Sequence, residues 1–466
     1  MQRNNDELNA IYNSLETYFG ADIRFQWEKE IGRGSNGISY QFKYTDLKEG
    51  ESKLLPHHIT KRVVLKIAPD DYAISRSVPG QIENVLGGAV IDSDDNHRPL
   101  FDTNPDEDFL ASAGIENESS SQDSGKGRNS EATKQLANEL RLLQDFAGSH
   151  HVVSLVEVKR DPLGKEMSKE KYGVRQHDMN NWIYMEYLEN GTLGDFIINY
   201  RQQYPGKTLP NRLLWRFFMC LVRGCLVLAY GPESEKYTWA ELDADLGQAD
   251  IGNLAHFDIH DGNVMLGNVL PAIQPSEHEI TPILKLIDFG SADILNENEP
   301  KNQRAVLEEE YEDGWEYNIY DIGHMMTSLI LLDSNPQLPR VTRRSNTDPP
   351  EMQYTETVRV QDEVFHTSGI QLVPNNETLQ DVDLELKLLV CACLAVDPRC
   401  RPTPTDLAAQ IGRHIATEDA TKAGETNADI SIILEGVIFN ASPIGALGVA
   451  QNTSQKRRKF LNGEEQ

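Results

Sequence analysis

Residues 256–263 read His-Phe-Asp-Ile-His-Asp-Gly-Asn, and residues 287–290 read Ile-Asp-Phe-Gly. The two segments contain two carboxylates, Asp258 and Asp288, and one carboxamide, Asn263. Hard oxygen ligands of this kind bind magnesium together with substrate phosphates, and a further carboxylate can accept a proton from a hydroxyl. Capping of turns by the same Asx residues is the ordinary alternative.

Short apolar runs border both polar segments. Residues 264–267 read Val-Met-Leu-Gly, and residues 283–287 read Ile-Leu-Lys-Leu-Ile. Runs of this length between polar segments are typical of β-strands. Two such strands joined by a turn would bring both polar segments to the same edge.

Composition limits the class of protein. The chain has 466 residues, of which 39% are hydrophobic, enough for a large core and for two or three domains. The net charge of −29 argues against nonspecific binding to nucleic acids or anionic membranes, so we expect neither as a partner. The basic run at 456–459 is the exception, and it fits either a nuclear address or a solvated charge run.

The cysteines indicate a reducing compartment. Their number is odd and their spacing fits neither a zinc site nor a disulfide framework; they are Cys220, Cys225, Cys391, Cys393 and Cys400. The N-terminal residues contain no apolar signal region. The longest apolar run, 217–230, is interrupted by Arg223 and is too short to span a bilayer. We expect a cytoplasmic protein, with a nuclear location as the alternative.

Strand patterns dominate the first part of the chain. Alternation of apolar and polar residues predicts strands at 25–31, 38–44, 62–68, 152–158 and 182–187. Helical spacing predicts an amphipathic helix at 7–19 and another at 131–146, with an apolar face of Leu136, Leu140, Leu143 and Ala147.

Helical patterns dominate the second part. The predicted helices lie at 213–230, 317–332, 384–396 and 407–415, and a strand-like run follows at 430–439. We therefore expect an α+β fold of two lobes. A helical extension, the N-lobe, the C-lobe and a tail would occupy residues 1–24, 25–188, 189–416 and 417–466.

Polar segments interrupt both lobes. Residues 91–130 are rich in Ser, Asp, Glu, Asn and Gly and cannot bury enough apolar surface to fold, so we expect a disordered acidic insertion. The acidic loop 231–250 and the polar stretch 333–375 would be insertions in the C-lobe, and residues 159–181 a long hairpin connection.

A glycine pattern precedes a lysine and a glutamate. Gly32, Gly34 and Gly37 are followed by a strand pattern rather than the helix that a dinucleotide-binding fold requires. A glycine hairpin can lie over phosphates, or it can be an ordinary turn. Lys66 ends an apolar strand and Glu139 lies on the polar side of the next predicted helix, where each could simply face solvent. Alternatively, Glu139 could hold the ammonium group of Lys66 against phosphates.

In this order the motifs resemble those of a eukaryotic-type protein kinase domain, over about residues 25–415. The glycine loop at 32–37 is followed by Val63-Val64-Leu65-Lys66, which resembles the lysine motif of the family. Residues 318–323 and 397–402 resemble two motifs that lie late in the kinase domain. The resemblance implies a bilobal kinase-like fold with a small β-rich N-lobe carrying one helix, a larger helical C-lobe, and ATP between them.

The resemblance also implies roles for single residues. Asp258 would be the catalytic base, Lys66 and Glu139 the ion pair on the phosphates, and Asn263 and Asp288 the Mg²⁺ ligands. ATP contacts are implied for Ile31, Gly32, Gly34, Gly37, Ser39, Val64, Lys66, Met185, Glu186 and Leu188, with Met185 as gatekeeper.

Several residues depart from the kinase pattern. Phe257 replaces the arginine that receives an activation-loop phosphate, and the segment from Ala292 to Trp315 contains no Ser or Thr. We therefore expect activity that does not need activation-loop phosphorylation. His260 stands in the place of the lysine that contacts the γ-phosphate, so it is a catalytic candidate with less fixed charge.

Other departures concern support of the site. Ser39 stands in place of a valine and Val64 in place of an alanine beside the adenine. Asn318 stands in place of the aspartate that braces the catalytic loop. Arg401 lacks its usual acidic partner, for which one of the glutamates at 308–310 could substitute.

The expected function is transfer of the γ-phosphate of Mg-ATP to Ser or Thr hydroxyls of a protein substrate. One alternative is an ATP-binding pseudokinase whose acidic insertions contact partners. The other is a small-molecule kinase of the aminoglycoside or choline type, which shares the His-x-Asp-x-x-x-x-Asn pattern and often has a histidine at the place of His260.

Overall fold

A four-stranded antiparallel sheet in the order β1-β2-β3-β4 forms the first part of the structure. Its strands are β1 (Phe25–Gly34), β2 (Gly37–Thr45), β3 (Thr60–Ile67) and β4 (Trp182–Glu186). The strands predicted at 25–31, 38–44, 62–68 and 182–187 are confirmed to within a few residues at their ends. The segment predicted as a strand at 152–158 is not one, because it makes only isolated bridges through Val152 and Leu155.

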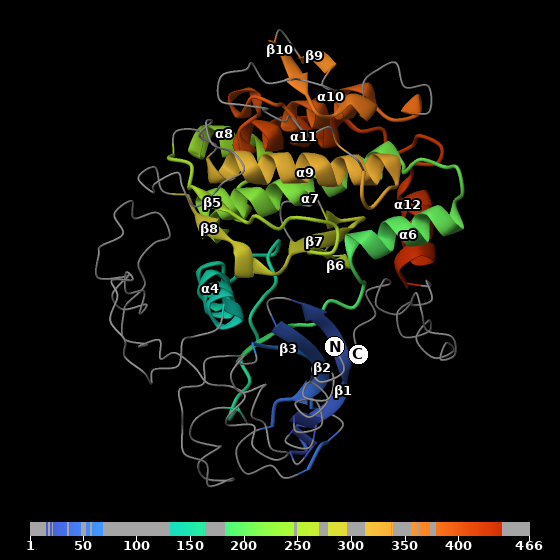
Figure 1. Ribbon diagram of the computed structural model, residues 1–466. Coiled ribbons are helices and arrows are strands. Elements are labelled where there is room, and N and C mark those ends of the chain that lie inside the picture. Colours follow the sequence, from blue (N-terminus) through green and yellow to red (C-terminus); the bar gives the residue numbers. More distant parts are fainter. Residues whose placement is uncertain are drawn as a thin grey trace, which may run out of the picture. The chain divides into compact units, whose positions relative to one another are not determined.

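The computed structural model describes residues 15–16, 19–20, 22–34, 37–47, 53–55, 58–68, 131–161, 163, 182–246, 249–269, 278–295, 313–336, 338, 356–360, 363–372 and 379–439. The chain forms two compact units. Unit 1 comprises Met1–Ala147, Val153–Tyr187 and Phe289–Ser291, and unit 2 comprises Gly148–Val152, Leu188–Asp288 and Ala292–Gln466. The composition is mixed α+β, as predicted, with the sheet in the N-terminal part (Figure 1).

One face of the sheet is apolar. Strand residues alternate between the two faces, and the aromatic side chains of β1 and β2 fall on the same one. There Phe19 stacks on Phe42 and meets Phe25 edge to face, with ring centroids 5.2 and 5.1 Å apart. Burial of this aromatic cluster holds the strands in register, because a slip of one residue would expose it.

The opposite face carries the residues predicted to bind nucleotide. Ser39 lies across from Lys66, and Val64 lies across from Met185. Residues directly opposite each other, or two apart on one strand, share a face. These four side chains therefore project from the same side of the sheet.

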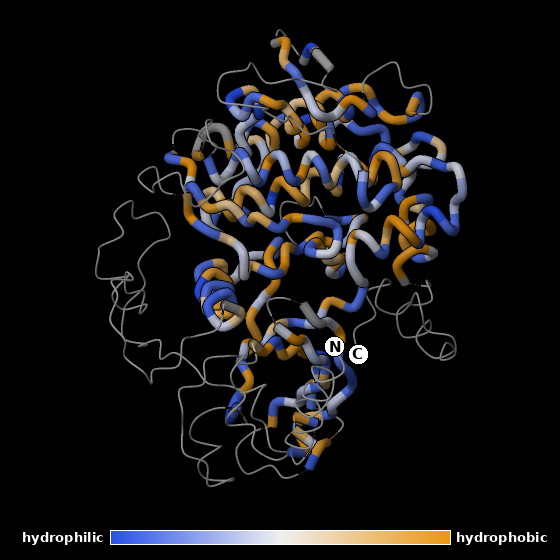
Figure 2. The backbone as a smooth tube through the Cα atoms, viewed as in Figure 1, coloured by the Kyte–Doolittle hydropathy of each residue, from blue (hydrophilic) through white to orange (hydrophobic). Residues whose placement is uncertain are grey.

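Helix α4 (Glu131–Asp145) completes the described part of unit 1. Hydrophilic and hydrophobic residues alternate along it at helical spacing (Figure 2). Leu136 and Leu143 are buried as predicted, but Ala147 is exposed and lies beyond the end of the helix.

Unit 2 is mainly helical. Its helices are α6 (Leu193–Gln203), α7 (Asn211–Tyr230), α8 (Trp239–Asp245), α9 (Gly314–Leu331), α10 (Leu384–Cys393), α11 (Pro404–Thr417) and α12 (Asn427–Leu434). Helix α7 packs against both α9 and α11, and α10 packs against α9 (Figure 1). The four helices predicted after residue 210 are confirmed.

Helix α7 is long and apolar enough to cross a membrane by length and composition, which corrects the estimate that this run is too short. It is 94% buried within the structure over its most apolar window. A core helix of a large domain passes the same test, so its length is weak evidence for a membrane span. Its apolar surface is used here to pack the surrounding helices.

Three other segments differ from the prediction. Residues 231–250 contain the 3₁₀ helix η2 (Pro232–Lys236) and α8, so they are not simply a loop. The polar stretch 333–375 contains the hairpin of β9 (Glu356–Val360) and β10 (Glu363–Thr367). The run 430–439 is helical, because α12 continues into a π-helix at Glu435–Phe439.

Two small strand pairs in unit 2 position its polar loops. Strand β5 (Leu254–Ala255) pairs with β8 (Asp293–Ile294), and β6 (Val264–Val269) pairs antiparallel with β7 (Pro282–Leu286). The predicted pairing of the two apolar runs is therefore confirmed. The insertion 91–130, the connection beyond 163, the glutamates 308–310, most of the helix at 7–19 and the basic run 456–459 lie outside the described residues.

Candidate active site

A buried ion pair joins β3 to α4 within unit 1. The Lys66 Nζ lies 2.6 Å from the Glu139 Oε2, and the two side chains are 8% and 1% exposed. The expectation that Glu139 lies on the polar side of the helix is wrong. One turn of helix places Glu139 beside Leu136, Leu142 and Leu143, so the carboxylate lies on the buried face.

The glycine segment is a tight hairpin between β1 and β2. Gly34 pairs with Gly37, and the two residues between them lie outside the described part of the chain. Gly37 has a φ of +138°, and a Cβ there would collide with the carbonyl of Ile67. This position requires glycine. The exposed Ile31 and Gly32 precede the turn on β1.

Strand pairing and one side-chain hydrogen bond fix the positions of the residues predicted for the hinge. Val64 and Met185 are both 8% exposed and face each other across β3 and β4. The Glu186 carboxylate accepts a hydrogen bond from the Ser154 N–H at 2.9 Å. It therefore joins β4 to the segment that contains Ser154. Leu188 is buried and belongs to unit 2.

In unit 2, the loop between β5 and β6 brings Asp258 and Asn263 together. The Asn263 Nδ2 donates hydrogen bonds to the Asp258 Oδ2 and to the Asp258 carbonyl, each at 2.9 Å. The amide group of Asn263 thus fixes the carboxylate, while its Oδ1 remains available as a hard oxygen ligand for a cation. The Asp258 side chain is 42% exposed and can meet a substrate.

Asp288 follows β7 at the point where the backbone meets this loop. The Ile287 N–H donates to the Asn263 carbonyl at 3.0 Å, which fixes the residue preceding Asp288 to the loop. Asp288 has a φ of +64°, a left-handed conformation that is uncommon for residues other than glycine. Strained backbone of this kind clusters at functional sites.

His256 forms the buried floor of this loop. Its ring Nε2 lies 3.2 Å from the Ile287 carbonyl and its side chain is fully buried. Burial lowers the pKa of His256 to about 4, although the negative charge of Asp288 acts in the opposite direction. The ring is therefore neutral at physiological pH.

Asn318 of α9 braces the loop from below. Its Oδ1 accepts a hydrogen bond from the His256 N–H at 2.9 Å, and its Nδ2 donates to the Leu254 carbonyl at 2.8 Å. From the sequence, Asn318 was only a departure from the aspartate of the kinase pattern. The structure shows that the carboxamide satisfies two buried backbone groups at once.

His260 lies among the acids of the same loop. Its Nε2 is 3.7 Å from the Asp258 Oδ1, and its Nδ1 accepts a hydrogen bond from the Gly262 N–H at 3.1 Å. A neutral ring bonded in this way carries its proton on Nε2, the nitrogen that faces Asp258. The Nε2–H of His260 can therefore point toward the Asp258 carboxylate.

Phe257 and Arg401 occupy unusual environments. Phe257 has a φ of +61° and its ring meets Tyr317 edge to face, with centroids 5.3 Å apart. Arg401 donates to the carbonyls of Ala395 and Glu316 at 3.0 and 2.9 Å and lies over the Tyr320 ring. Backbone carbonyls and an aromatic ring thus surround this buried guanidinium.

The short segment Phe289–Ser291 belongs to unit 1. The ring of Phe289 is buried and packs against Phe146 at 5.5 Å between centroids. The Asn138 Nδ2 donates to the Phe289 carbonyl at 3.4 Å. The Asp-Phe-Gly segment is therefore divided, with Asp288 in unit 2 and Phe289 packed beside α4.

No protein-family model matches this chain, and no curated protein matches its sequence. The roles of the site residues therefore depend on their chemistry and geometry.

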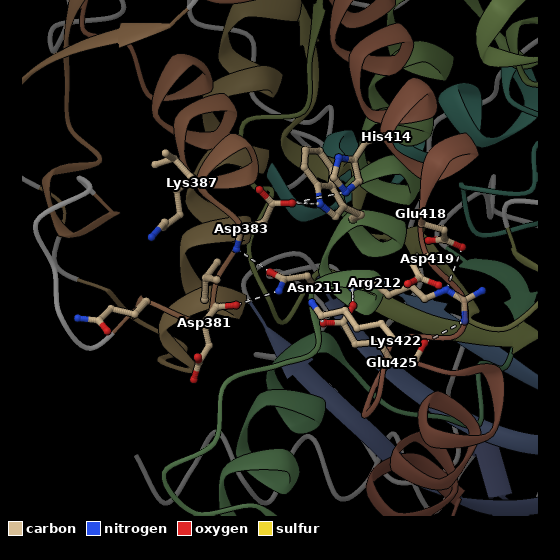
Figure 3. Close-up of a pocket in the computed structure, with 14 residues that line it drawn as sticks. Asn211, Arg212, Asp381, Asp383, Lys387, His414, Glu418, Asp419, Lys422 and Glu425 are labelled. Atoms are coloured by element: carbon tan, nitrogen blue, oxygen red, sulfur yellow. Dashed lines mark hydrogen bonds and ion pairs between the residues drawn. The ribbon is translucent and has the colours of Figure 1, made fainter.

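A separate pocket in unit 2 lies among α7, α10 and α11. Its described lining includes none of the residues predicted for catalysis or nucleotide binding. Figure 3 shows Arg212 and Glu418 turned toward each other, with Nε and Oε1 2.9 Å apart. Trp215 and His414 stack at 4.0 Å. The Arg212–Glu418 ion pair and the Trp215–His414 stack show that several lining side chains of this pocket contact one another.

Each unit has its own set of candidate residues. Unit 1 offers a lysine ammonium held by a buried carboxylate. Unit 2 offers the partly exposed carboxylate of Asp258, which accepts a hydrogen bond from Asn263, a second aspartate, Asp288, with a positive φ, and the imidazole of His260. A cation with phosphate ligands fits Asn263 and Asp288 in the second set.

Proposed function

We propose that this protein is a protein kinase of the eukaryotic type, which transfers the γ-phosphate of Mg-ATP to Ser or Thr hydroxyls of a protein. The observation that carries the proposal is the Lys66–Glu139 pair. Burial of an ion pair costs several kcal/mol of desolvation per ion, which the pair's attraction only partly offsets. A buried pair is therefore poor evidence of a role in stability, and a positioned ammonium for phosphate oxygens explains it.

Asp258 is the proposed general base. Its carboxylate would accept the proton of the attacking hydroxyl, while the two hydrogen bonds from Asn263 keep it oriented. Mg²⁺ would be held by Asn263 and Asp288 and would neutralise charge on the β- and γ-phosphates. His260, with its proton on Nε2, would donate toward the transferred phosphoryl group or toward Asp258.

The proposed fold is correspondingly that of a kinase, with unit 1 as the N-lobe and unit 2 as the C-lobe. Activity would not require activation-loop phosphorylation. The place of the phosphate-receiving arginine is taken by Phe257, whose ring contacts Tyr317 and offers no positive charge.

A second candidate is an ATP-binding pseudokinase that acts as an interaction module. His260 favours it, because an imidazole whose Nδ1 accepts a hydrogen bond from the Gly262 N–H lacks the fixed positive charge of a lysine. Stabilisation of the transition-state charge would then be weaker.

The test is transfer of radiolabelled γ-phosphate from Mg-ATP to mixed protein substrates by the pure full-length protein. Asp258→Asn and Lys66→Met should each reduce transfer by at least about 100-fold. Matched controls are Asp250→Asn and Lys61→Met, which change exposed residues outside the proposed site. Nucleotide binding without any transfer would favour the pseudokinase, and transfer to a sugar or amine but not to protein would refute the protein substrate.

A further inference from the structure

A cluster of chemically reactive side chains lies inside unit 2, apart from the residues discussed so far. It contains His151, Cys220 of α7, Glu235 of η2 and His278, which precedes β7. All four side chains are buried, with exposed fractions between 1% and 8%. Because they come from four separate segments, no spacing motif in the sequence reveals them.

Three of these residues place possible metal ligands close together. The Nε2 atoms of His151 and His278 are 3.0 Å apart, and the Cys220 Sγ is 3.8 Å from the His278 Nδ1. One ligand atom from each residue can be chosen so that all lie within 4.8 Å of one another. Zinc binds nitrogen at about 2.0–2.1 Å and sulfur at about 2.3 Å, so ligands of one tetrahedral ion lie about 3.3–3.7 Å apart.

Neighbouring polar groups hydrogen-bond to these possible ligands and orient them. The Glu235 Oε1 lies 2.7 Å from the His151 Nδ1, which leaves the other ring nitrogen of His151 to face His278. The Glu235 carboxylate also accepts hydrogen bonds from the Ser149 hydroxyl and the His150 N–H. A carboxylate on the distal nitrogen is the usual support of a metal-binding histidine.

The sulfur of Cys220 also accepts a hydrogen bond from a neighbouring group. The Leu284 N–H donates to the Cys220 Sγ at 2.9 Å. An N–H donor stabilises a thiolate more than a thiol. None of the five cysteines forms a disulfide in the described part of the chain, so no S–S bond occupies the Cys220 sulfur, which also lies 3.8 Å from the Leu284 carbonyl.

We propose that His151, His278 and Cys220 form a buried zinc site, with Glu235 as the residue that orients His151. Two imidazoles and one thiolate suit zinc better than magnesium or calcium, which prefer oxygen ligands. Binding would replace the thiol proton of Cys220 with a Zn–S bond and release that proton to solvent, without any change of oxidation state. Water would complete the tetrahedron.

Acidic and basic groups both lie near the site. The thiolate and the Glu235 carboxylate together offset the two positive charges of the ion. Arg216 and Arg223 of α7 also act on His278 and oppose a cation. Arg216 shares the Glu418 carboxylate with Arg212, and Arg223 donates to the Tyr237 carbonyl at 2.8 Å.

Such an ion would fasten the segments beside the candidate active site. The His151 carbonyl accepts a hydrogen bond from the Leu286 N–H at 2.8 Å, two residues before Asp288. Zinc at this place would therefore stabilise the end of β7 and join it to α7 and η2. The alternative is a hydrogen-bonded chain from Cys220 through both histidines to Glu235 without an ion.

The test uses the full-length protein purified without chelators. We expect about one zinc per chain by elemental analysis, and replacement by Co²⁺ should give a sulfur-to-cobalt charge-transfer band in the near ultraviolet. Cys220→Ser should abolish that band, whereas Cys225→Ser, a buried cysteine of the same helix, should keep it. Glu235→Gln should weaken zinc binding about 10–100-fold.

A second measurement does not depend on variants that fold. Removal of zinc from the wild-type protein by a strong chelator should lower the Tm, and zinc should restore it while Mg²⁺ should not. Absence of both zinc and the cobalt band in folded wild-type protein, or a Tm indifferent to chelator and zinc, would overturn the proposal. Neither readout uses phosphate transfer, so failure of the kinase proposal would leave this result unaffected.

Discussion

Asn318 accepts a hydrogen bond from the main-chain N–H of His256 through its Oδ1, at 2.9 Å. Its Nδ2 simultaneously donates to the Leu254 carbonyl at 2.8 Å, and the Asn318 side chain is 1% exposed. An aspartate at this place could accept the first bond but could not donate the second. The asparagine is therefore matched to two backbone groups at the start of the loop between β5 and β6.

We predict that Asn318→Asp destabilises the protein. A carboxylate would face the Leu254 carbonyl without a hydrogen between them, and an unsatisfied buried acceptor costs about 1–3 kcal/mol. The free energy of unfolding from urea denaturation measures this loss. Asn335→Asp, at an exposed position after α9, serves as the matched control. Equal stability of Asn318→Asp and wild type at neutral pH would contradict the assigned hydrogen bonds.

The second prediction concerns the buried ion pair. Lys66→Met alone should cost about 3–5 kcal/mol in unfolding free energy, because it leaves the Glu139 carboxylate buried without its cation. The double variant Lys66→Met with Glu139→Leu should regain most of that loss, since an apolar pair of similar volume replaces a desolvated one. Both variants should lose phosphate transfer. A double variant that is no more stable than the single one would show that the pair's contribution is structural.

Local pattern predicted the sheet and its polar residues well. Alternation placed β1 to β4, and the order of glycine loop, lysine and glutamate singled out Lys66 and Glu139 before any contact was known. Burial of Glu139 was not predictable in this way. A charged residue among leucines in a helix is normally expected to face solvent. Burial of the Glu139 carboxylate is compensated by its ion pair with Lys66 on β3, which local sequence does not reveal.

Segments stabilised by distant contacts were predicted poorly. The acidic residues 231–250 suggested a loop, yet Glu235 is buried because its carboxylate receives hydrogen bonds from His150 and His151. The run 430–439 is apolar and β-branched, so its composition favoured a strand, but Thr426 caps the helix α12 through the Asp429 N–H. The partners of Glu235 lie 85 and 84 residues away in the sequence, whereas the cap of α12 is a local Thr-x-x-Asp pattern that the strand prediction overlooked.

The third prediction compares two glycines of the hairpin. Gly37→Ala should destabilise unit 1 by about 1–3 kcal/mol, because the residue has a φ of +138° and the new methyl group would meet the Ile67 carbonyl. Gly32→Ala should have a smaller effect, since no atom lies within 4 Å of a Cβ there. Thermal unfolding and Mg-ATP affinity can be compared for the pair. Equal effects on stability would contradict the observed backbone conformation of Gly37.

The last prediction concerns pH. The pKa of His256 is about 4 in the folded protein because of burial, against an ordinary value of 6.5. Between these values the unfolded chain binds a proton that the folded chain does not, so the free energy of unfolding rises with pH. This contribution is fully present above pH 6.5 and is lost as the pH falls toward 4, by up to about 1.4 kcal/mol per pH unit.

Urea denaturation at several pH values between 4.5 and 7.5 measures this slope. Because burial also lowers the pKa of His278, to about 2, the wild-type slope contains both histidines and the comparison must be made between variants. His256→Gln should reduce the slope of the free energy of unfolding against pH by up to about 1.4 kcal/mol per pH unit, the contribution of one proton. His150→Gln, at an exposed position, should leave the slope unchanged. Identical slopes for His256→Gln and wild type would mean that His256 titrates normally, which its full burial and its contact with the Ile287 carbonyl argue against.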